Sequence, residues 1–345
     1  MGIHQITGNS PISLSSCPQA SCGHFTCPAV KDGLRSRYYD AAFSIPFHLS
    51  AAHLGRPAHE NHAGPGTARP GNGLRGSLGN QRPSGSHEHG EGGEWEGIPL
   101  HRLWEERREE LFGPGYERFT RFPLLCKILD ARENLSVQVH PPERTAAARR
   151  GEVKNEVWYV LHADPDALIY GGMEETATLS DIRRAAETGQ MEQLIRSTHL
   201  EKGEHLYIPA GLVHAIGAGH LIAEIQQNSD TTYRLYDWNR TDASGQGREL
   251  HMEQALDSIA EFRELCRQPG YLTEMPHFTT EEYRLDQGER FTQPDASRFA
   301  IFTVLRGSVS WDGKTARQGE FILSPANADA VTAVEPDTVL LSTTV

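Results

Sequence analysis

The segment from Ser136 to Pro142, SVQVHPP, alternates apolar and polar side chains and then ends in two prolines. This pattern predicts a strand that stops at the prolines. Side chains two positions apart on a strand share a face, so Gln138 and His140 should point one way and Val137 and Val139 the other. Polar side chains on an inner face need partners there. The segment therefore predicts a polar cluster inside a β structure.

Two further stretches offer partners for that cluster. Glu156 opens the apolar run EVWYVL, and His214 follows a turn in YIPAGLVHAIG. Two histidines, a carboxylate and an amide presented from strands are a suitable ligand set for a hard-to-borderline metal ion. The alternative is that each is an ordinary hydrogen-bonded core side chain.

Charge and cysteine content narrow the class of protein. The net charge of −13 over 345 residues argues against nucleic acid as the main partner. The sequence has no apolar run of membrane length, and residues 1–10 lack the order of a secretory signal. Five cysteines, an odd number, form no obvious disulfide framework. We therefore expect a reduced, cytoplasmic protein whose main partner is neither nucleic acid nor a membrane.

The chain divides into three parts by pattern. Residues 1–92 are rich in Gly, Pro, Ser and His and lack sustained periodicity, which is typical of disorder. Residues 93–262 contain many short strands with Gly and Pro turns, which indicates a barrel or jelly roll. Residues 263–345 return to strands and predict a second, smaller β unit.

Helices are expected at three places. Residues 98–113 form an amphipathic pattern, and residues 179–198 are predicted to be helical with a break near Gly189 and Ser180 as a possible N-cap. Residues 251–262 predict a connecting helix. The fold class is therefore mainly β with a helical insertion.

Four motifs resemble one known family in its order: FPLLCKILDARENLSVQVHPP, GEVKNEVWYVL, YIPAGLVHAIGAG and EIQQNSDTTYRLYDWNRTD. They resemble the short bacterial type I mannose-6-phosphate isomerases, which are zinc-dependent cupins. The resemblance covers roughly residues 93–345. It implies a cupin barrel followed by a degenerate cupin-like β unit, and an aldose–ketose isomerase acting on mannose 6-phosphate and fructose 6-phosphate.

The resemblance also assigns roles to side chains. It implies one zinc ion per chain, bound by Gln138, His140, Glu156 and His214. It implies that Lys154 lies near the substrate, that Arg234 is the active-site arginine, and that Glu224 is a carboxylate in the pocket. Each has a plainer alternative, namely a surface lysine, an arginine paired with Asp230 or Asp237, and a carboxylate bonded to nearby threonines.

The N-terminal part departs from the family, which begins with Ile-Trp-Gly-Gly-like and Ala-His-Pro motifs. Residues 53–60, HLGRPAHE, can be back-translated so that a frame shifted by one nucleotide reads Ile-Trp-Gly-Gly-Arg-Arg-Met. Residues 77–84, SLGNQRPS, can likewise give Ala-Trp-Glu-Ile-Asn-Ala-His-Pro. We hypothesise a displaced reading frame before about Gly92, which would leave the first family strands out of this polypeptide.

Two other classes of function stay open at this level. An iron-dependent cupin oxygenase would use two histidines and one carboxylate. The amide of Gln138 and the charges of Lys154 and Arg234 favour an anionic sugar and a redox-inert metal instead. A non-enzymatic or inactive metal- and sugar-binding cupin is the other alternative, because the N-terminal strands would be missing.

Overall fold

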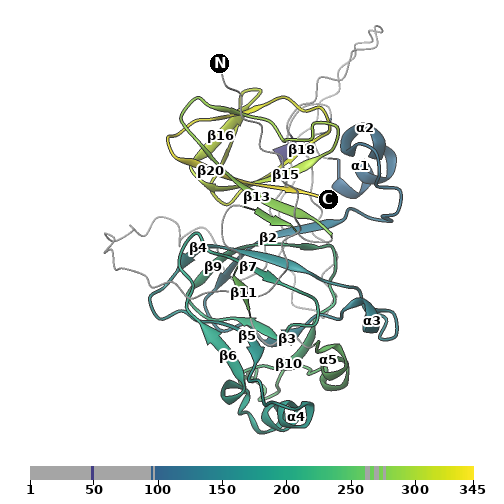
Figure 1. The fold of residues 1–345 in the computed structure, drawn as a ribbon, viewed down its shortest axis with the longest axis vertical. Helices are drawn as coiled ribbons and strands as arrows, with labels where there is room; N and C mark the ends of the chain where they lie inside the picture. The colour runs from purple at the N-terminus through teal and green to yellow at the C-terminus, as the bar shows by residue number, and fades with distance from the viewer. Residues whose placement is uncertain (1–47, 50–94, 96–97, 261–264, 268–271, 275–276) are drawn as a thin grey trace, which may run out of the picture. The chain divides into compact units, whose positions relative to one another are not determined.

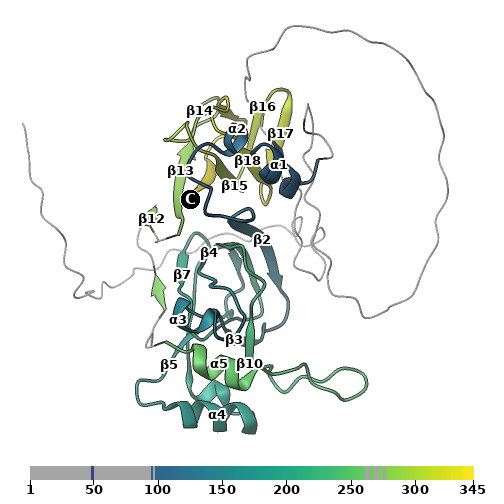
Figure 2. The ribbon, with the colours of Figure 1, turned by 90° about the vertical axis from the view of Figure 1, so that its right-hand side faces the viewer.

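The computed structural model describes residues 48–49, 95, 98–260, 265–267, 272–274 and 277–345. The described chain is mainly strand, as expected (Figures 1 and 2). Most of residues 1–92 lie outside the described residues, and with them the predictions of disorder and of a displaced reading frame. The strand β1 (His48–Leu49) falls within that segment and pairs in parallel with β18 (Phe321–Ser324).

Two five-stranded sheets build the first β unit. Sheet 1 runs in the order β11 (Cys266–Arg267), β7 (His205–Ile208), β4 (Glu156–Ala163), β9 (His220–Gln227) and β2 (Leu124–Ala131). Sheet 2 runs in the order β10 (Tyr233–Tyr236), β3 (Val137–Val139), β8 (His214–Ile216), β5 (Ile169–Met173) and β6 (Ile195–Thr198). All pairs within both sheets are antiparallel.

The alternation of side chains gives each sheet an inner and an outer face. A buried apolar cluster with members on both sheets, including Trp158, Leu206 and Ile222 from sheet 1 and Ile169 and Ile216 from sheet 2, fills one part of the space between them. The two sheets therefore face each other as the halves of a jelly-roll barrel, which is the cupin architecture expected.

Helices cover the outer face of sheet 2. Val137 and Val139 of β3 pack with Ile182 of α4 (Leu179–Thr188) and Leu256 of α5 (Met252–Ser258) in a second buried cluster. Between α4 and β6 lies the short 3₁₀ helix η2 (Met191–Gln193). The insertion expected between strands is thus confirmed, and Figure 1 shows α4 and α5 beside the strands of sheet 2.

The inserted helix begins two residues earlier than predicted. Thr178, not Ser180, is the N-cap, because its side chain accepts from the Asp181 amide while the Asp181 carboxylate accepts from the Thr178 amide. The helix ends at Gly189, whose φ of +70° is left-handed. A side chain there would also meet Asn239. Residues 195–198, predicted to be helical, form β6 instead, because they pair with β5.

The C-terminal β unit has two sheets. Sheet 3 has the order β1, β18, β15 (Ala300–Arg306), β20 (Thr338–Thr344), β13 (Thr279–Leu285) and β12 (Leu272–Glu274). Sheet 4 has the order β14 (Arg290–Phe291), β19 (Val331–Ala333), β16 (Ser308–Trp311) and β17 (Lys314–Arg317). Their apolar side chains enclose a separate core that includes Phe302, Val309 and Leu340. A smaller β unit at the C-terminus is therefore confirmed.

The largest apolar cluster joins the two β units. It combines Cys126, Val157 and Ile225 on the outer face of sheet 1 with Ile301 and Leu341 of sheet 3. The helices α1 (Leu100–Glu106) and α2 (Arg108–Phe112) replace the single amphipathic helix predicted, with a break at Arg107, and their apolar side chains join the same cluster. The expected boundary at residues 262/263 stays a prediction; β11, beyond it, pairs with β7 of sheet 1.

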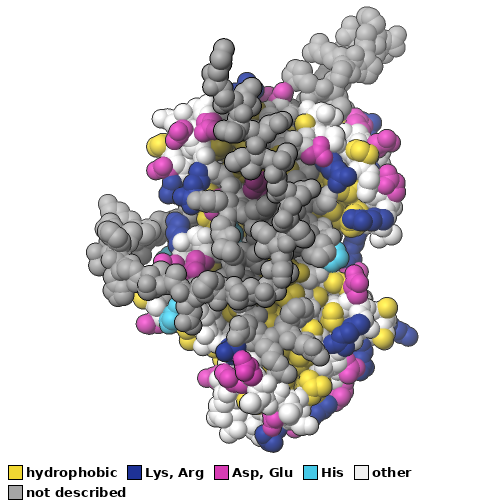
Figure 3. Space-filling view, in the orientation of Figure 1, with side chains coloured by type: hydrophobic (Ala, Val, Ile, Leu, Met, Phe, Trp, Pro, Cys, Tyr) yellow, Lys and Arg dark blue, Asp and Glu magenta, His cyan; other side chains and the backbone are white. Residues whose placement is uncertain are grey.

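The surface carries charges of both signs. Figure 3 shows Lys and Arg side chains interspersed with Asp and Glu side chains over the described surface of one face. In the described part of the chain, no helix is long and apolar enough to cross a membrane.

Candidate metal centre

Strand register brings three sequence-predicted residues into one row. Gln138 on β3 lies directly opposite His214 on β8 and, on its other side, opposite Arg234 on β10. Residues directly opposite in antiparallel strands project to the same side of the sheet. Since Val137 and Val139 occupy the outer face, the row points into the barrel. The predicted inward face of β3 is therefore confirmed.

Sheet 1 contributes a facing set of polar side chains. Glu156 of β4 lies opposite Gln226 of β9, and Glu224 of β9 lies between Trp158 of β4 and Lys127 of β2. By alternation, all of these share the inner face. The polar end of the barrel is thus assembled from six strands, three from each sheet.

Three of these side chains form a compact cluster. His140 Nε2 lies 3.2 Å from Glu156 Oε1, and His214 Nε2 lies 4.0 Å from Glu156 Oε2. One ligand atom from each residue lies within 4.8 Å of the others, and all three side chains are completely buried. A cluster of this composition and size can hold a metal ion.

The two imidazoles are oriented by the backbone. His140 Nδ1 lies 2.9 Å from the Thr231 carbonyl oxygen, and His214 Nδ1 lies 2.9 Å from the Leu212 carbonyl oxygen. A carbonyl only accepts, so each Nδ1 carries the proton and each Nε2 presents its lone pair to the cluster. Burial lowers the pKa of His140 to about 4 and also lowers the pKa of His214. Both rings are therefore neutral at pH 7, which is the form that binds metals.

Glu156 is the only acid in the cluster, and its charge is compensated locally. Burial alone would raise the pKa of Glu156, but Lys154 and His140 outweigh burial and bring the pKa well below its usual value. Lys154 Nζ lies 2.6 Å from Oε1, and Trp158 Nε1 donates to Oε2 at 3.0 Å. The carboxylate is thus ionised and held in a fixed orientation.

The donor set fits a divalent metal such as zinc. His140 Nε2 is buried and makes no hydrogen bond of good geometry with a described residue. Buried polar atoms of this kind are rare unless something else satisfies them. Gln138 adds an amide next to the cluster, with Nε2 3.3 Å from His214 Nε2. Rotating the amide would present its oxygen instead, since the two ends are nearly isosteric.

The contacts of the other predicted residues bear on the plainer alternative for each. Lys154 is 5% exposed, so it is not a surface lysine. Glu224 pairs with Lys127 at 2.8 Å rather than with the threonines that follow it. The Asp237 carboxylate is bonded by Arg240 and Arg248, while Arg234 Nη1 donates to the Glu249 carbonyl oxygen.

Lys127 and Gln226 belong to the same inner face but were not singled out from the sequence. Lys127 Nζ donates to Glu224 Oε1 and to Gln226 Oε1. The signal was present in FPLLCKIL, where one lysine interrupts an otherwise apolar run. A charge on a buried strand face implies a partner on a neighbouring strand.

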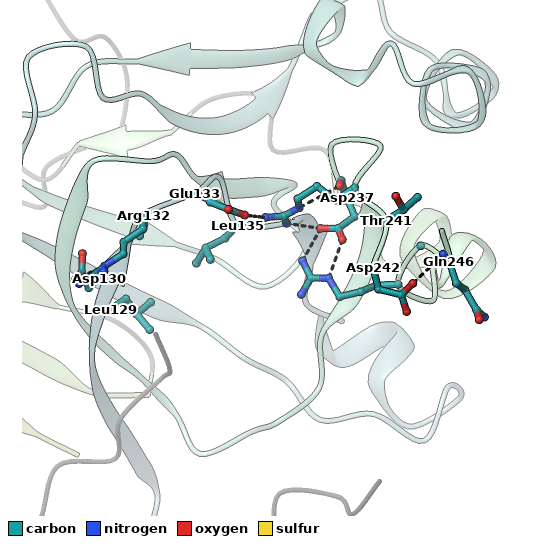
Figure 4. A pocket seen from close by; sticks show the side chains of 13 residues that line it. Leu129, Asp130, Arg132, Glu133, Leu135, Asp237, Thr241, Asp242 and Gln246 are labelled. Carbon is teal, nitrogen blue, oxygen red and sulfur yellow. Dashed lines mark hydrogen bonds and ion pairs between the residues drawn. The ribbon is translucent and has the colours of Figure 1, made fainter. Parts of the chain in front are cut away.

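A pocket opens between the edge strands of the two sheets. It encloses about 890 Å³. One wall is formed by residues 129–133 and 135, from the end of β2 and the loop that follows it, and the other by residues 237, 240–242 and 246–248, which follow β10. Asp237 lies between two guanidinium groups (Figure 4), those of Arg240 and Arg248. Burial lowers the pKa of Arg234, and the nearby charge of Arg248 adds to this effect. Three arginines thus gather near one aspartate at the side of the barrel.

Comparisons with known proteins agree on one family. A family model described as the catalytic domain of type I phosphomannose isomerase matches residues 79–182. A mannose-6-phosphate isomerase from Streptococcus mutans is 35% identical over 249 residues, which cover 68% of this chain and 77% of that protein. The crystal structure of mannose 6-phosphate isomerase from Bacillus subtilis matches with a TM-score of 0.64 and 28% identity, over 74% of this chain and 84% of that one. A zinc-bound mannose 6-phosphate isomerase shares the fold at a TM-score of 0.55 and 16% identity, over 72% of this chain and 85% of that one.

A jelly-roll barrel with a buried His–Glu–His cluster at its polar end defines this chain as a metal-binding cupin. The matched region extends over more than two thirds of the Streptococcus protein. The chain belongs to the type I mannose-6-phosphate isomerase family and is an isomerase.

The cluster yields a direct prediction for metal retention. We expect the His140→Ala variant to lose its bound metal after dialysis, because one of three buried ligands is removed and the Glu156 charge loses a partner. Metal analysis by mass spectrometry is the measurement. His162→Ala, which changes a half-exposed histidine outside the cluster, is the control and should keep full occupancy. Full occupancy in His140→Ala would show that the cluster is not the metal site.

Proposed function

We propose that this chain interconverts mannose 6-phosphate and fructose 6-phosphate, with one zinc ion held by Gln138, His140, Glu156 and His214. The observation that carries the proposal is the buried cluster in which two neutral imidazoles direct Nε2 at an ionised carboxylate. The names of the relatives give mannose 6-phosphate as a substrate, and fructose 6-phosphate is the ketose formed by its aldose–ketose isomerisation. An iron-dependent oxygenase is not favoured by the same evidence, because the relatives are isomerases.

The reaction moves a proton between C1 and C2 of the sugar through an enediol or enediolate. It requires a base beside the two carbons and positive charge near the two oxygens. Zinc, when bound, supplies Lewis-acid polarisation of the carbonyl group. The remaining requirements fall to the side chains of the chain itself.

Glu224 and Lys127 form an acid–base pair on the inner face of sheet 1. Their 2.8 Å contact places a carboxylate and an ammonium together, with Glu224 5% exposed. We assign proton transfer at the carbons to Glu224 and hydrogen-bond donation to a sugar oxygen to Lys127. Lys154, paired with Glu156, adds a second buried ammonium beside the metal ligands.

Arg234 supplies fixed positive charge from the opposite sheet. It shares the inner row with Gln138 and His214, and its Nε is buried without a hydrogen-bond partner among the described residues. A buried donor of this kind is suited to an oxyanion that forms only during the reaction.

The substrate phosphate is assigned to the side pocket. Arg240 and Arg248 both contact the Asp237 carboxylate near Arg234, and Arg240 also pairs with Glu133 at 3.3 Å. Arginine forks match phosphate geometry. Asp237, which lines the pocket, directly follows β10, and Arg234 of β10 lies opposite Gln138, so a sugar bound at the arginines can extend along β10 toward the metal cluster.

The reaction proposed for this chain and its cellular location both remain predictions. An inactive, sugar-binding cupin is the alternative to the enzyme, and it is separable from the proposal by turnover. We also propose a cytoplasmic location, which the cysteine content of the sequence supports.

Activity should depend on metal in the following way. We expect the purified chain to convert fructose 6-phosphate to mannose 6-phosphate, to lose that activity after chelation, and to recover it when zinc is added back. A coupled assay follows the rate. Binding of mannose 6-phosphate by calorimetry without turnover would favour the inactive alternative. Full activity in the metal-free protein would contradict the metal role.

Arg234→Lys should keep the fold and the metal but lose turnover. An ammonium cannot hold two oxygens as a planar guanidinium does. Loss of one oxyanion contact costs about 2.7–4 kcal/mol in the barrier, or roughly 100- to 1,000-fold in kcat. Steady-state kinetics and metal analysis on the same sample provide the test. An unchanged kcat would leave Arg234 with a structural role only.

Arg248→Met should weaken substrate binding and leave turnover nearly intact. Arg248 is 52% exposed, so solvent reduces the strength of its contact with phosphate. We expect KM to rise about threefold to tenfold, with the inhibition constant of inorganic phosphate rising in parallel. Arg284→Met, in the C-terminal unit, is the matched control. A fall in kcat at constant KM would show that the substrate phosphate does not bind in this pocket.

A further inference from the structure

Gln226 is completely buried on the inner face of β9, beside Glu156 of β4. Its amide nitrogen donates to two backbone carbonyl oxygens, those of Gln227 and Ser229, each at 2.9 Å. An amide nitrogen has two hydrogens, so both are used. The amide oxygen is therefore forced to the opposite side, where it accepts from Lys127 Nζ.

The reverse orientation of the amide is excluded by electrostatics. It would direct the amide oxygen at two carbonyl oxygens and the amide hydrogens at an ammonium group. Each of these is a contact between like partial charges in a buried site, where such contacts cost most. The Gln226 side chain therefore has one stable orientation, and that orientation presents an acceptor to Lys127.

Lys127 depends on this acceptor for its position. A lysine side chain has four rotatable bonds and loses considerable conformational entropy when it is fixed. A single contact with Glu224 would let the ammonium swing around the carboxylate. Two acceptors, Glu224 Oε1 and Gln226 Oε1, fix Nζ in place. Within the described part of the chain no third partner of Nζ is found, so one N–H group is left for a bound molecule.

We infer that Gln226 is a positioning residue that sets the place of the Lys127 ammonium in the reaction, a step that rests on the proposed role of Lys127. Gln226 does not itself need to touch the sugar. Replacing Gln226 should therefore lower kcat, and the same replacement should have little effect on kcat when Lys127 is absent.

A merely structural role has a different signature. One of the two carbonyl groups that accept from Gln226 belongs to Ser229, and the Ser229 hydroxyl accepts from the Thr231 amide. The Thr231 carbonyl in turn orients His140. If Gln226 only held this turn, its loss would loosen His140 and lower metal occupancy rather than act through Lys127.

A double-mutant cycle on the zinc-loaded full chain separates the two roles. The four proteins are the unmodified chain, Gln226→Met, Lys127→Met and the double variant, with kcat, KM and zinc content measured for each. We expect Gln226→Met to lower kcat about 10- to 100-fold, the value of a hydrogen bond to a charged group, with KM changed less than about threefold. Zinc content should stay full. In the Lys127→Met background, the same change should cost less than about threefold.

Two more variants keep the test decisive. Gln226→Asn retains a buried amide but is one carbon shorter, so it should show the same coupling without placing an apolar group in a polar site. Gln287→Met removes an exposed amide that donates to the Val334 carbonyl in the C-terminal unit, and should leave kcat unchanged.

The outcomes that overturn the inference are distinct from failure of the proposed function. If losses from Gln226 and Lys127 multiply in the double variant, or if kcat falls only in proportion to zinc content, Gln226 is structural. If the Gln226→Met variant keeps more than half of the original kcat, Gln226 does not position the Lys127 ammonium for the reaction. If Lys127→Met itself has normal kcat, the role proposed for Lys127 is wrong, and the inference about Gln226 is wrong with it.

Discussion

The ionised carboxylate of Glu156, buried completely between two sheets, is the interaction on which the polar end of the barrel depends. A buried charge costs several kcal/mol unless it is compensated. Here Lys154, the Trp158 indole and two imidazoles surround it. These partners come from β4, from β8 and from residues directly after β3 and just before β4, so these three strands must come together for the buried charge to be compensated. The apolar cluster at the other end of the same barrel supplies the driving force for that meeting.

Alternation within single strands carried most of the predictable part of the site. Gln138 and His140 could be placed on one face from SVQVHP alone, and β4 and β9 followed from runs of strand-forming residues. The two-part β architecture was also predictable, because turn residues separate short apolar segments throughout. These features are local, and the sequence specifies them within a few residues.

Features that depend on register between distant strands could not be predicted in the same way. Lys127 and Glu224 are separated by 97 positions, and only the pairing of β2 with β9 brings them together. The ion pairs of Asp237 form only when the loop after β10 folds back, so that Arg240 and Arg248 reach the same carboxylate. The predicted and observed starts of α4 differ for a more local reason. Ser180 and Thr178 are both good N-cap residues. Asp181, three residues after Thr178, completes a capping box and so makes Thr178 the N-cap.

The shortness of β3 has a consequence for how the barrel is made. This strand has three residues and pairs with β8 only through Gln138 and His214. A slip by one residue would exchange its two faces, bringing valines to the metal cluster and an amide into the apolar layer beneath α4 and α5. A metal ion would bind only the correct pairing and would stabilise that pairing alone. The register of β3, which β10 also specifies through three residue pairs, is therefore thermodynamically coupled to metal binding, so each stabilises the other.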